Sequence, residues 1–323
     1  MATYVLGSNP FNQLSLSMIN YNSKNWFEAV RNFKTSYVIR RTMRMCLGMG
    51  AYAALIYAFD YVSNEYPEYI PYSLHIMEIN TSIFGLLGVF LSLLLVFRTN
   101  TAYDRWWEGR KQWGALINHT RGMAAIWHGM LSKSDHVNRQ FFARAISGFS
   151  LALSDHLRDH ANHEWILSYS EEDEARIKSF EHVPNKIVRD IYERAEMLYK
   201  DGFIDGFQLT QVRPEAQSFL DIQGACERIK ATPIPFAHNF FIKLLILLYI
   251  ALLPFVLVPS IGYFAIILTM MVAYALVGIE YISVEIEEPF GLDCNDLPTH
   301  NLARKIEKNE HEILEVDLVQ ADK

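Results

Sequence analysis

The chain has 323 residues, of which 51% are hydrophobic and 20% charged, and its mean hydropathy is only +0.06. Neither an ordinary soluble domain nor a protein lying wholly within a membrane fits this balance, so the apolar residues are expected to be clustered. The net charge of −7 argues against nucleic acid as a partner, because neutralising phosphates requires a concentrated basic surface. The three cysteines, Cys46, Cys226 and Cys294, are widely separated and odd in number, which predicts free thiols.

Three segments contain no Asp, Glu, Lys or Arg: residues 45–59, 82–97 and 244–279. A membrane-spanning helix needs about 20 apolar residues. The third segment is too long for one span, and Pro254, Pro259 and Gly262 in its middle predict a hairpin of two spanning helices. The first segment is short enough to be a buried soluble helix, but arginines before it and tyrosines after it favour a span. Four spans are therefore predicted.

Basic residues flank the first two spans on one side, and the connection between these spans contains acidic residues but no Lys or Arg. This bias predicts that both termini are cytoplasmic, in a multi-pass protein of the cell membrane. The predicted segments are a cytosolic N-terminal segment (1–41), the first span (42–62), an extracytoplasmic loop (63–73), the second span (74–98), a cytosolic helical domain (99–236), the third span (237–258), the fourth span (261–284) and a cytosolic C-terminal segment (285–323).

Apolar residues recur at helical spacing in the region between the second and third spans, and no sustained alternating pattern of strands is present. Helices are predicted over 171–200, bent or split at Pro184, and over 213–230. The tail 301–323 is charged and has no apolar core of its own, so it is expected to lie on a neighbouring surface or to be loose. The fold class is therefore an all-α integral membrane protein with a large helical cytosolic domain.

The second span carries two stripes of side chains. Gly85, Gly88 and Ser92 would let another helix approach closely, while Val89, Leu93 and Phe97 follow one another at intervals of four. Repeated around a symmetry axis, the second stripe would form an apolar constriction. Spacing alone leaves open whether it lines a pore or faces lipid and other helices.

Three short motifs lie at the ends of the predicted spans. The first follows the second span and includes Arg105, Trp106 and Trp107. The second is an Ile-Pro entry into the third span with Pro233 and Pro235, and the third is the Pro289-Phe290-Gly291 motif after the membrane. In this order along the chain, the three motifs resemble those of the bestrophin family, especially its bacterial members, and the similarity covers roughly residues 26–302.

This resemblance implies a homopentameric ion channel, mostly helical, with one central pore. The family's apolar neck falls on Val89, Leu93 and Phe97, and its second, cytosolic constriction falls on Phe207, with Ile204 as the nearest rival. Chloride or other anions are the expected permeant ions. A sodium channel of the same family and a non-conducting tetraspan scaffold or sensor are the alternatives. Polar residues just beyond the neck, Arg98, Thr99 and Asn100, are candidates for setting selectivity.

Metal and catalytic sites have weaker support. In the family, calcium binds an acidic run after the Pro-Phe-Gly motif, but here that run has only Asp293 and Asp296, so a calcium site is doubtful and no cofactor is expected. Residues at one-turn spacing could bind a metal, although a solvated helix face explains them equally well. No catalytic constellation has a recognisable spacing, so an enzyme is not expected. The one-turn set is Asp155, His156, Asp159, His160 and His163.

Overall fold

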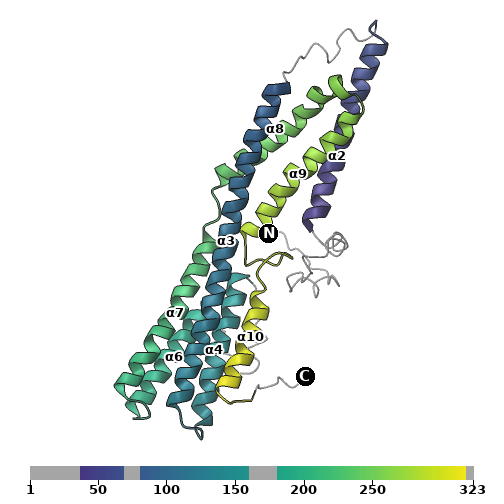
Figure 1. Ribbon diagram of the computed structural model, residues 1–323. Coiled ribbons are helices and arrows are strands. Elements are labelled where there is room, and N and C mark those ends of the chain that lie inside the picture. The colour runs from purple at the N-terminus through teal and green to yellow at the C-terminus, as the bar shows by residue number, and fades with distance from the viewer. Residues whose placement is uncertain (1–36, 69–80, 160–179, 318–323) are drawn as a thin grey trace. The chain divides into compact units, whose positions relative to one another are not determined.

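The computed structural model describes residues 37–68, 81–159 and 180–317, and the regular elements in these ranges are all α-helices (Figure 1). The all-α expectation is thus confirmed for the described residues. The helices form two compact units. We call residues 37–105 and 233–288 the apolar-helix unit, and residues 106–232 and 289–317 the bundle unit, and each is described by itself.

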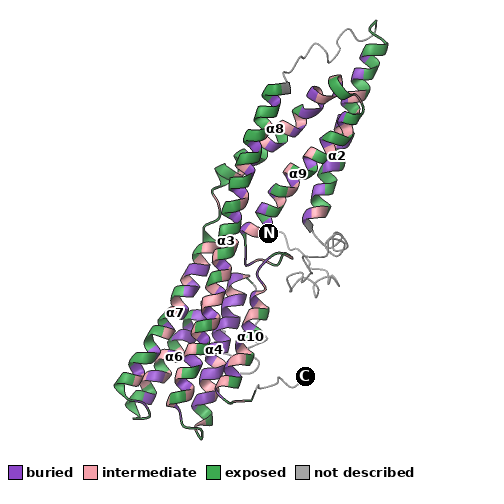
Figure 2. Ribbon diagram, in the orientation of Figure 1, coloured by how far each residue is buried: buried purple, intermediate pink, exposed green. Residues whose placement is uncertain are grey.

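The apolar-helix unit contains α2 (Tyr37–Glu65), the first part of α3 (Thr81–Met130), α8 (Phe236–Ile261) and α9 (Phe264–Glu287). All four helices are long and apolar enough to cross a membrane. Their mutual packing buries a small set of side chains, while much of their apolar surface is exposed in the single chain (Figure 2). The largest cluster of buried apolar residues is Cys46, Leu91, Leu95, Ile242, Ile246, Ile250, Ala273 and Val277, and two smaller clusters lie apart from it.

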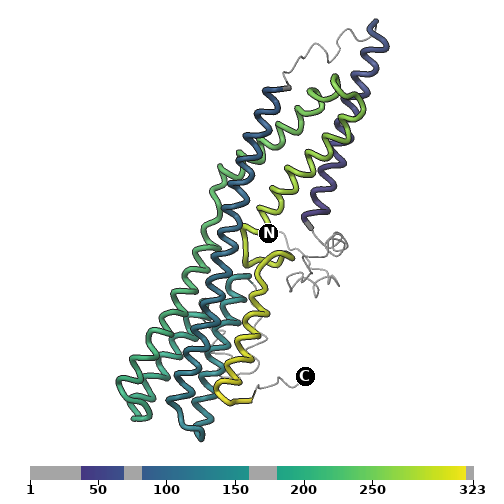
Figure 3. The backbone as a smooth tube through the Cα atoms, viewed as in Figure 1, coloured from purple at the N-terminus to yellow at the C-terminus, as the bar shows by residue number. Residues whose placement is uncertain are grey.

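The turn between α8 and α9 has two residues, as the predicted bounds of the third and fourth spans imply, but it lies three positions later than the predicted 259–260. The chain doubles back at Gly262 and Tyr263 (Figure 3), and Gly262 has a φ of +58°, which glycine adopts without steric cost. Pro254 and Pro259 lie inside α8, not in the turn, and α9, the predicted fourth span, begins at Phe264 instead of residue 261. Membrane helices tolerate internal prolines where neighbouring groups satisfy the backbone. The Tyr52 hydroxyl donates a hydrogen bond to the Ala251 carbonyl at 3.2 Å, one residue after Ile250, whose carbonyl would be the helical partner of an N–H that Pro254 lacks.

The sequence predicts that the second span ends at residue 98, where the composition changes from apolar to charged, but the helix does not end there. Helix α3 continues without interruption to Met130. Its later half keeps a helical apolar stripe, with Trp113, Leu116 and Trp127 fully buried, so packing sustains the helix beyond the apolar segment. The predicted start of the second span, 74–80, lies outside the described residues, as do residues 69–73 of the preceding loop.

The bundle unit packs the later half of α3 side by side with α4 (His136–Leu157), α6 (Val183–Lys200), α7 (Gly206–Ala231) and α10 (Thr299–Ile313) (Figure 1). Stacked aromatic rings fill its core: Trp127 lies 3.6 Å from Phe142, and Phe149 lies 4.9 Å from Phe219, measured between ring centroids. Such contacts between helices bury enough apolar surface to fix their arrangement.

Two sequence expectations for this unit are refined. Pro184 lies in the first turn of α6, where its missing N–H has no helical partner to lose, so a helix starts there after the non-helical residues 180–182. The earlier part of the predicted helix, 171–179, lies outside the described residues. The C-terminal tail is not loose over its described part: α10 packs on α4, burying Ala303 and Ile306, and the hydroxyls of Ser154 and Thr299 lie 2.8 Å apart.

Candidate functional site

The predicted neck residues lie on a face of α3 that this chain leaves uncovered. Val89, Leu93 and Phe97 are 69%, 51% and 57% exposed, whereas Leu91 and Leu95 of the same helix are 3% and 2% exposed. One side of the helix therefore packs against its own subunit, and the other side presents apolar side chains outward (Figure 2). In a membrane protein such a face meets lipid or another chain.

Asn100 extends this outward face. It follows Leu93 by seven residues, two turns of helix, and it is exposed. Asp104, seven residues after Phe97, is exposed on the same side. The apolar stripe is thus continued by an amide and then by a carboxylate.

Arg98 and Thr99 point elsewhere. Arg98 is fully buried, and its Nη2 donates to Glu287 Oε2 at 2.5 Å, while its Nε lies 3.8 Å from Glu280 Oε2. The Thr99 hydroxyl is half-buried and lies 2.9 Å from that of Ser283. Of the three predicted selectivity residues, only Asn100 lies on the outward face, and the charge of Arg98 is balanced within the subunit.

Glu287, at the end of α9, contacts two of the three sequence motifs within the apolar-helix unit. Its second carboxylate oxygen accepts the Ile234 N–H at 2.8 Å, between Pro233 and Pro235, and its carbonyl oxygen accepts Arg105 Nε at 3.0 Å. Pro235 is the N-cap of α8. Sequence reasoning missed Glu280 and Glu287, although acidic residues next to an apolar segment are a signal of internal pairing.

The remaining motif residues meet in the bundle unit. Trp106 Nε1 donates to the Asn295 carbonyl at 3.0 Å, whereas Trp107 is 47% exposed. Phe290 is buried against Gly109, where an added Cβ would lie 3.1 Å from the ring. The Pro289 carbonyl accepts the Leu297 N–H at 2.8 Å, and Gly291 follows in the same loop. These motifs therefore fix the loop between α9 and α10 to α3.

Asp296 is engaged in shaping that loop. It is 3% exposed, and its Oδ2 accepts the Asp293 N–H at 2.7 Å. Burial lowers the pKa of the nearby Arg158, and the carboxylates of Asp296 and Asp155 oppose this shift. The Arg158 guanidinium also donates to the Leu297 carbonyl at 3.1 Å. A cationic partner and a backbone donor reduce what Asp296 can offer to calcium.

The two candidates for the cytosolic constriction differ in accessibility. Phe207, in the first turn of α7, is 83% exposed, and Ile204 is 4% exposed within the bundle core. The N-terminus of α7 is fixed by a capping box between Asp205 and Gln208. Phe207 is therefore held on the surface by a well-defined helix start.

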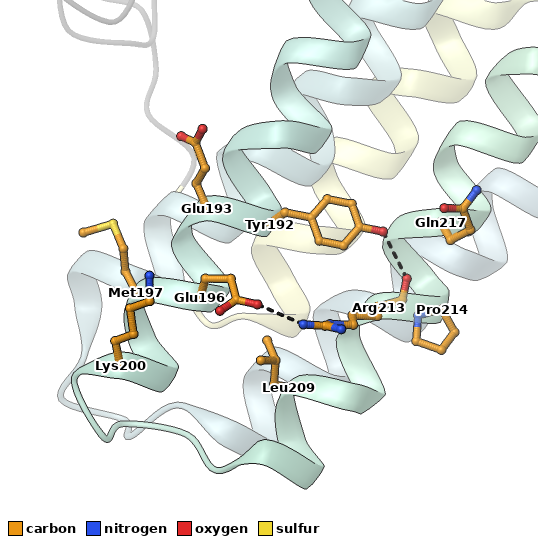
Figure 4. Close-up of a pocket in the computed structure, with 9 residues that line it drawn as sticks. All are labelled: Tyr192, Glu193, Glu196, Met197, Lys200, Leu209, Arg213, Pro214 and Gln217. Carbon is orange, nitrogen blue, oxygen red and sulfur yellow. Dashed lines mark hydrogen bonds and ion pairs between the residues drawn. The ribbon is translucent and has the colours of Figure 1, made fainter.

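A pocket opens between α6 and α7 in the bundle unit (Figure 4). Arg213 Nη2 lies 2.9 Å from Glu196 Oε1, and the Tyr192 hydroxyl donates to the Arg213 carbonyl at 3.4 Å. Burial raises the pKa of Tyr192. The ion pair of Arg213 and Glu196 thus joins α7 to α6 across the pocket. Its lining residues are Tyr192, Glu193, Glu196, Met197, Lys200, Leu209, Arg213, Pro214 and Gln217.

The one-turn metal set is not assembled as predicted. His160 and His163 lie outside the described residues. His156 instead lies beside His182 and Glu227, which come from other helices and were not singled out from the sequence. No local spacing relates these three residues, so no sequence signal connects them.

Comparisons with known proteins identify the family. The profile described as "Bacterial/Fungal Bestrophin protein" matches residues 18–312. A protein from Nostoc sp. named "Voltage-dependent anion channel-forming protein" is 34% identical over 292 residues, covering 88% of this chain and 91% of the relative. One of the same name from Mesorhizobium japonicum is 30% identical and covers 86% of each chain.

The fold agrees. A crystal structure of a bacterial bestrophin homologue from Klebsiella pneumoniae superposes with a TM-score of 0.74 at 23% identity, covering 84% of this chain and 99% of the other. The four apolar helices, the three motifs in order and the match over most of the chain lead to one conclusion. This chain is a multi-pass membrane protein that belongs to the bacterial and fungal bestrophin family.

Proposed function

We propose that the chain is one subunit of a homo-oligomeric anion channel whose neck is formed by Val89, Leu93 and Phe97 of several copies. The observation that carries the proposal is the uncovered apolar stripe on α3, exposed at 51–69% in the single chain. Copies arranged about an axis would cover this stripe by facing it inward. Five copies, as the family resemblance implies, are the number we propose.

An apolar neck controls conduction without binding an ion. It offers no oxygen or nitrogen atoms to replace the ion's hydration shell, so a narrow ring can dewet and block passage. Opening then requires the ring to widen. A passive pore of this kind performs no chemical step, in keeping with a family of channels and not of enzymes.

Selectivity for anions is supported by the relatives, which are named as anion channel-forming proteins. An uncharged neck discriminates little between the signs of charge, and Arg98, the cation nearest the neck, is neutralised by Glu287. One observation favours the cation alternative: the exposed carboxylate of Asp104 lies on the same side of α3 as the neck. Sodium is therefore the second candidate for the permeant ion.

A second constriction is proposed at Phe207, because its ring is exposed and can meet its counterparts, whereas Ile204 is committed to the core. Both termini are proposed to be cytoplasmic in the cell membrane, following the basic residues that flank the first two spans. The bundle unit would then be the cytosolic part of the pore.

Planar bilayers with asymmetric sodium chloride test the function. Purified protein is expected to give currents that reverse near the chloride equilibrium potential. Reversal near the sodium equilibrium potential would establish the cation alternative and refute anion selectivity. If the wild-type protein gives no current, Leu93→Ala and Phe97→Ala, which widen the neck, distinguish a closed channel from a non-conducting scaffold, because only the channel would gain conductance.

A further inference from the structure

The end of the bundle unit formed by the last turn of α4, the start of α6 and the last turns of α7 carries two imidazoles and a carboxylate that converge. His156 is in the last turn of α4, His182 is the N-cap of α6 and Glu227 is on α7. The ligand atoms of the three residues all lie within 4.8 Å of one another. Nothing in the channel mechanism requires this cluster.

The distances suit one small cation. Nε2 of His182 and Nε2 of His156 lie 3.0 and 3.2 Å from the same atom, Glu227 Oε1, and the ring centroids are 4.4 Å apart. Ligand atoms around tetrahedral zinc, with bonds of about 2.0–2.2 Å, lie about 3.3 Å apart. A metal ion between these three atoms would need only small side-chain shifts.

Without a metal ion, too many nitrogen atoms surround one oxygen atom of Glu227. Besides the two imidazoles, the Gln223 amide donates to Glu227 Oε1 at 3.0 Å, so three donors converge on one oxygen that has about two lone-pair directions. The His119–Glu215 pair, with a single imidazole at 2.7 Å from the carboxylate, shows the ordinary arrangement in the same unit. A cation that replaces the ring protons would relieve the crowding.

Charge and access favour a metal as well. Burial and the neighbouring His182 lower the pKa of His156, and Glu227 opposes this shift. Lys230, which donates to the His156 carbonyl at 3.3 Å, is paired with Asp159 at 2.6 Å, so its charge is balanced. The three side chains are 32–34% exposed, which leaves room for ion entry and for a water as the fourth ligand.

Binding has one local cost. The Asn185 N–H donates to His182 Nδ1 at 3.4 Å, a long hydrogen bond that caps α6. A metal on Nε2 places the ring proton on Nδ1 and removes this bond. The contact is at the limit of hydrogen-bond length, so its loss is small beside a metal–nitrogen bond.

We propose that His156, His182 and Glu227 form a Zn²⁺ site that ties α4, α6 and α7 together. Two imidazoles and one carboxylate are a donor set that zinc accepts, whereas Mg²⁺ and Ca²⁺ prefer all-oxygen sites. Such an ion would hold the start of α6 and the end of α7 in fixed positions. The site is independent of which ion the channel conducts.

The test uses the full-length oligomer in detergent, with any histidine tag removed because the tag itself binds zinc. Equilibrium dialysis followed by metal analysis is expected to find one Zn²⁺ per chain, resistant to excess Mg²⁺. His156→Gln and Glu227→Gln are each expected to weaken Zn²⁺ binding at least about tenfold, and zinc should raise the Tm of the wild type but not of either variant. His119→Gln is the matched control and should leave both readouts unchanged.

Two results would overturn the proposal: no stoichiometric zinc in the wild-type protein, or equal affinity in the wild type and the His156→Gln/Glu227→Gln double variant. The His182→Ala substitution removes both a ligand and the N-cap of α6, so for this variant the zinc affinity is the test and the Tm is not. Should a single variant fail to fold, the Co²⁺ absorption spectrum of the wild type still decides, because a tetrahedral site and an octahedral aqua ion give different intensities.

Discussion

At the scale of single residues, the buried ion pair of Arg98 and Glu287 is expected to matter for the stability of the folded protein. Removing one partner of a buried ion pair leaves an uncompensated charge, which costs about 3–5 kcal/mol. Glu287→Gln is therefore expected to lower the Tm of the purified protein strongly, and Arg98→Met added to it should recover part of the loss. Glu288→Gln, the exposed neighbour, is the control. Equal effects of the Glu287 and Glu288 substitutions would contradict the pairing.

Glu310 predicts an unusual dependence of stability on pH. Burial raises the pKa of this carboxyl to about 7, although Thr120 and Arg121 oppose the shift. The folded state then binds a proton more tightly than the unfolded state, so stability is greatest at low pH and is lost as pH rises from about 4.5 through 7. The full effect is at most about 3 kcal/mol.

Thermal unfolding at pH 5 and pH 8 measures this dependence. Glu310→Gln mimics the protonated carboxyl and should unfold at a higher temperature than the wild type at pH 8, with a much smaller difference at pH 5. Glu312→Gln, in the same helix but exposed, controls for the loss of charge. A difference that is the same at both pH values would show that Glu310 is not protonated by the fold.

At the scale of helices, a close approach between α3 and α8 depends on Gly88. A Cβ added there would lie 2.5 Å from the Tyr249 hydroxyl oxygen and 3.2 Å from its ring, which stacks on Phe84 at 4.4 Å. Gly88→Ala should therefore displace Tyr249 and lower the Tm, with an overpacking cost of about 1–3 kcal/mol. Gly48→Ala on α2, where nothing lies within 4 Å, should be neutral or stabilising. Equal Tm values for the two variants would count against this packing.

The sequence predicted the helices well and their ends less well. The apolar segments identify α8 and α9, because burial in lipid requires uninterrupted apolar residues. The change from apolar to charged residues near Arg98 does not end α3, since the bundle core packs on its later half. Pro254 and Pro259 lie inside α8 without ending it, which a local rule about helix breaking does not predict.

Candidate sites within one helix could be predicted from the sequence, whereas sites that join several helices could not. The stripe of Val89, Leu93 and Phe97 is visible from spacing, because all three residues are on one helix. The partners of Arg98 are 182 and more positions away along the chain, and the cluster of His156, His182 and Glu227 joins three helices. Such long-range groupings follow from tertiary packing, so a single sequence does not contain a local signal for them.

At the scale of the whole molecule, the account requires several copies of α3 to bring their uncovered stripes together around one axis. The stripe is apolar, exposed in the single chain and continued by Asn100. Neighbouring subunits would narrow the space between the rings of Phe97, and water would reach these side chains only along the conduction path. Side chains that pack within the subunit, such as Leu95, would stay inaccessible.

Blocking of a cysteine at position 93 tests this claim most directly. In a Cys294→Ser background, which removes the one native thiol that is not buried, Leu93→Cys channels are expected to lose current when a water-soluble thiol reagent is added. Leu95→Cys channels should keep their current. Currents that persist in Leu93→Cys channels after mass spectrometry has shown complete modification would contradict a pore lined by this stripe.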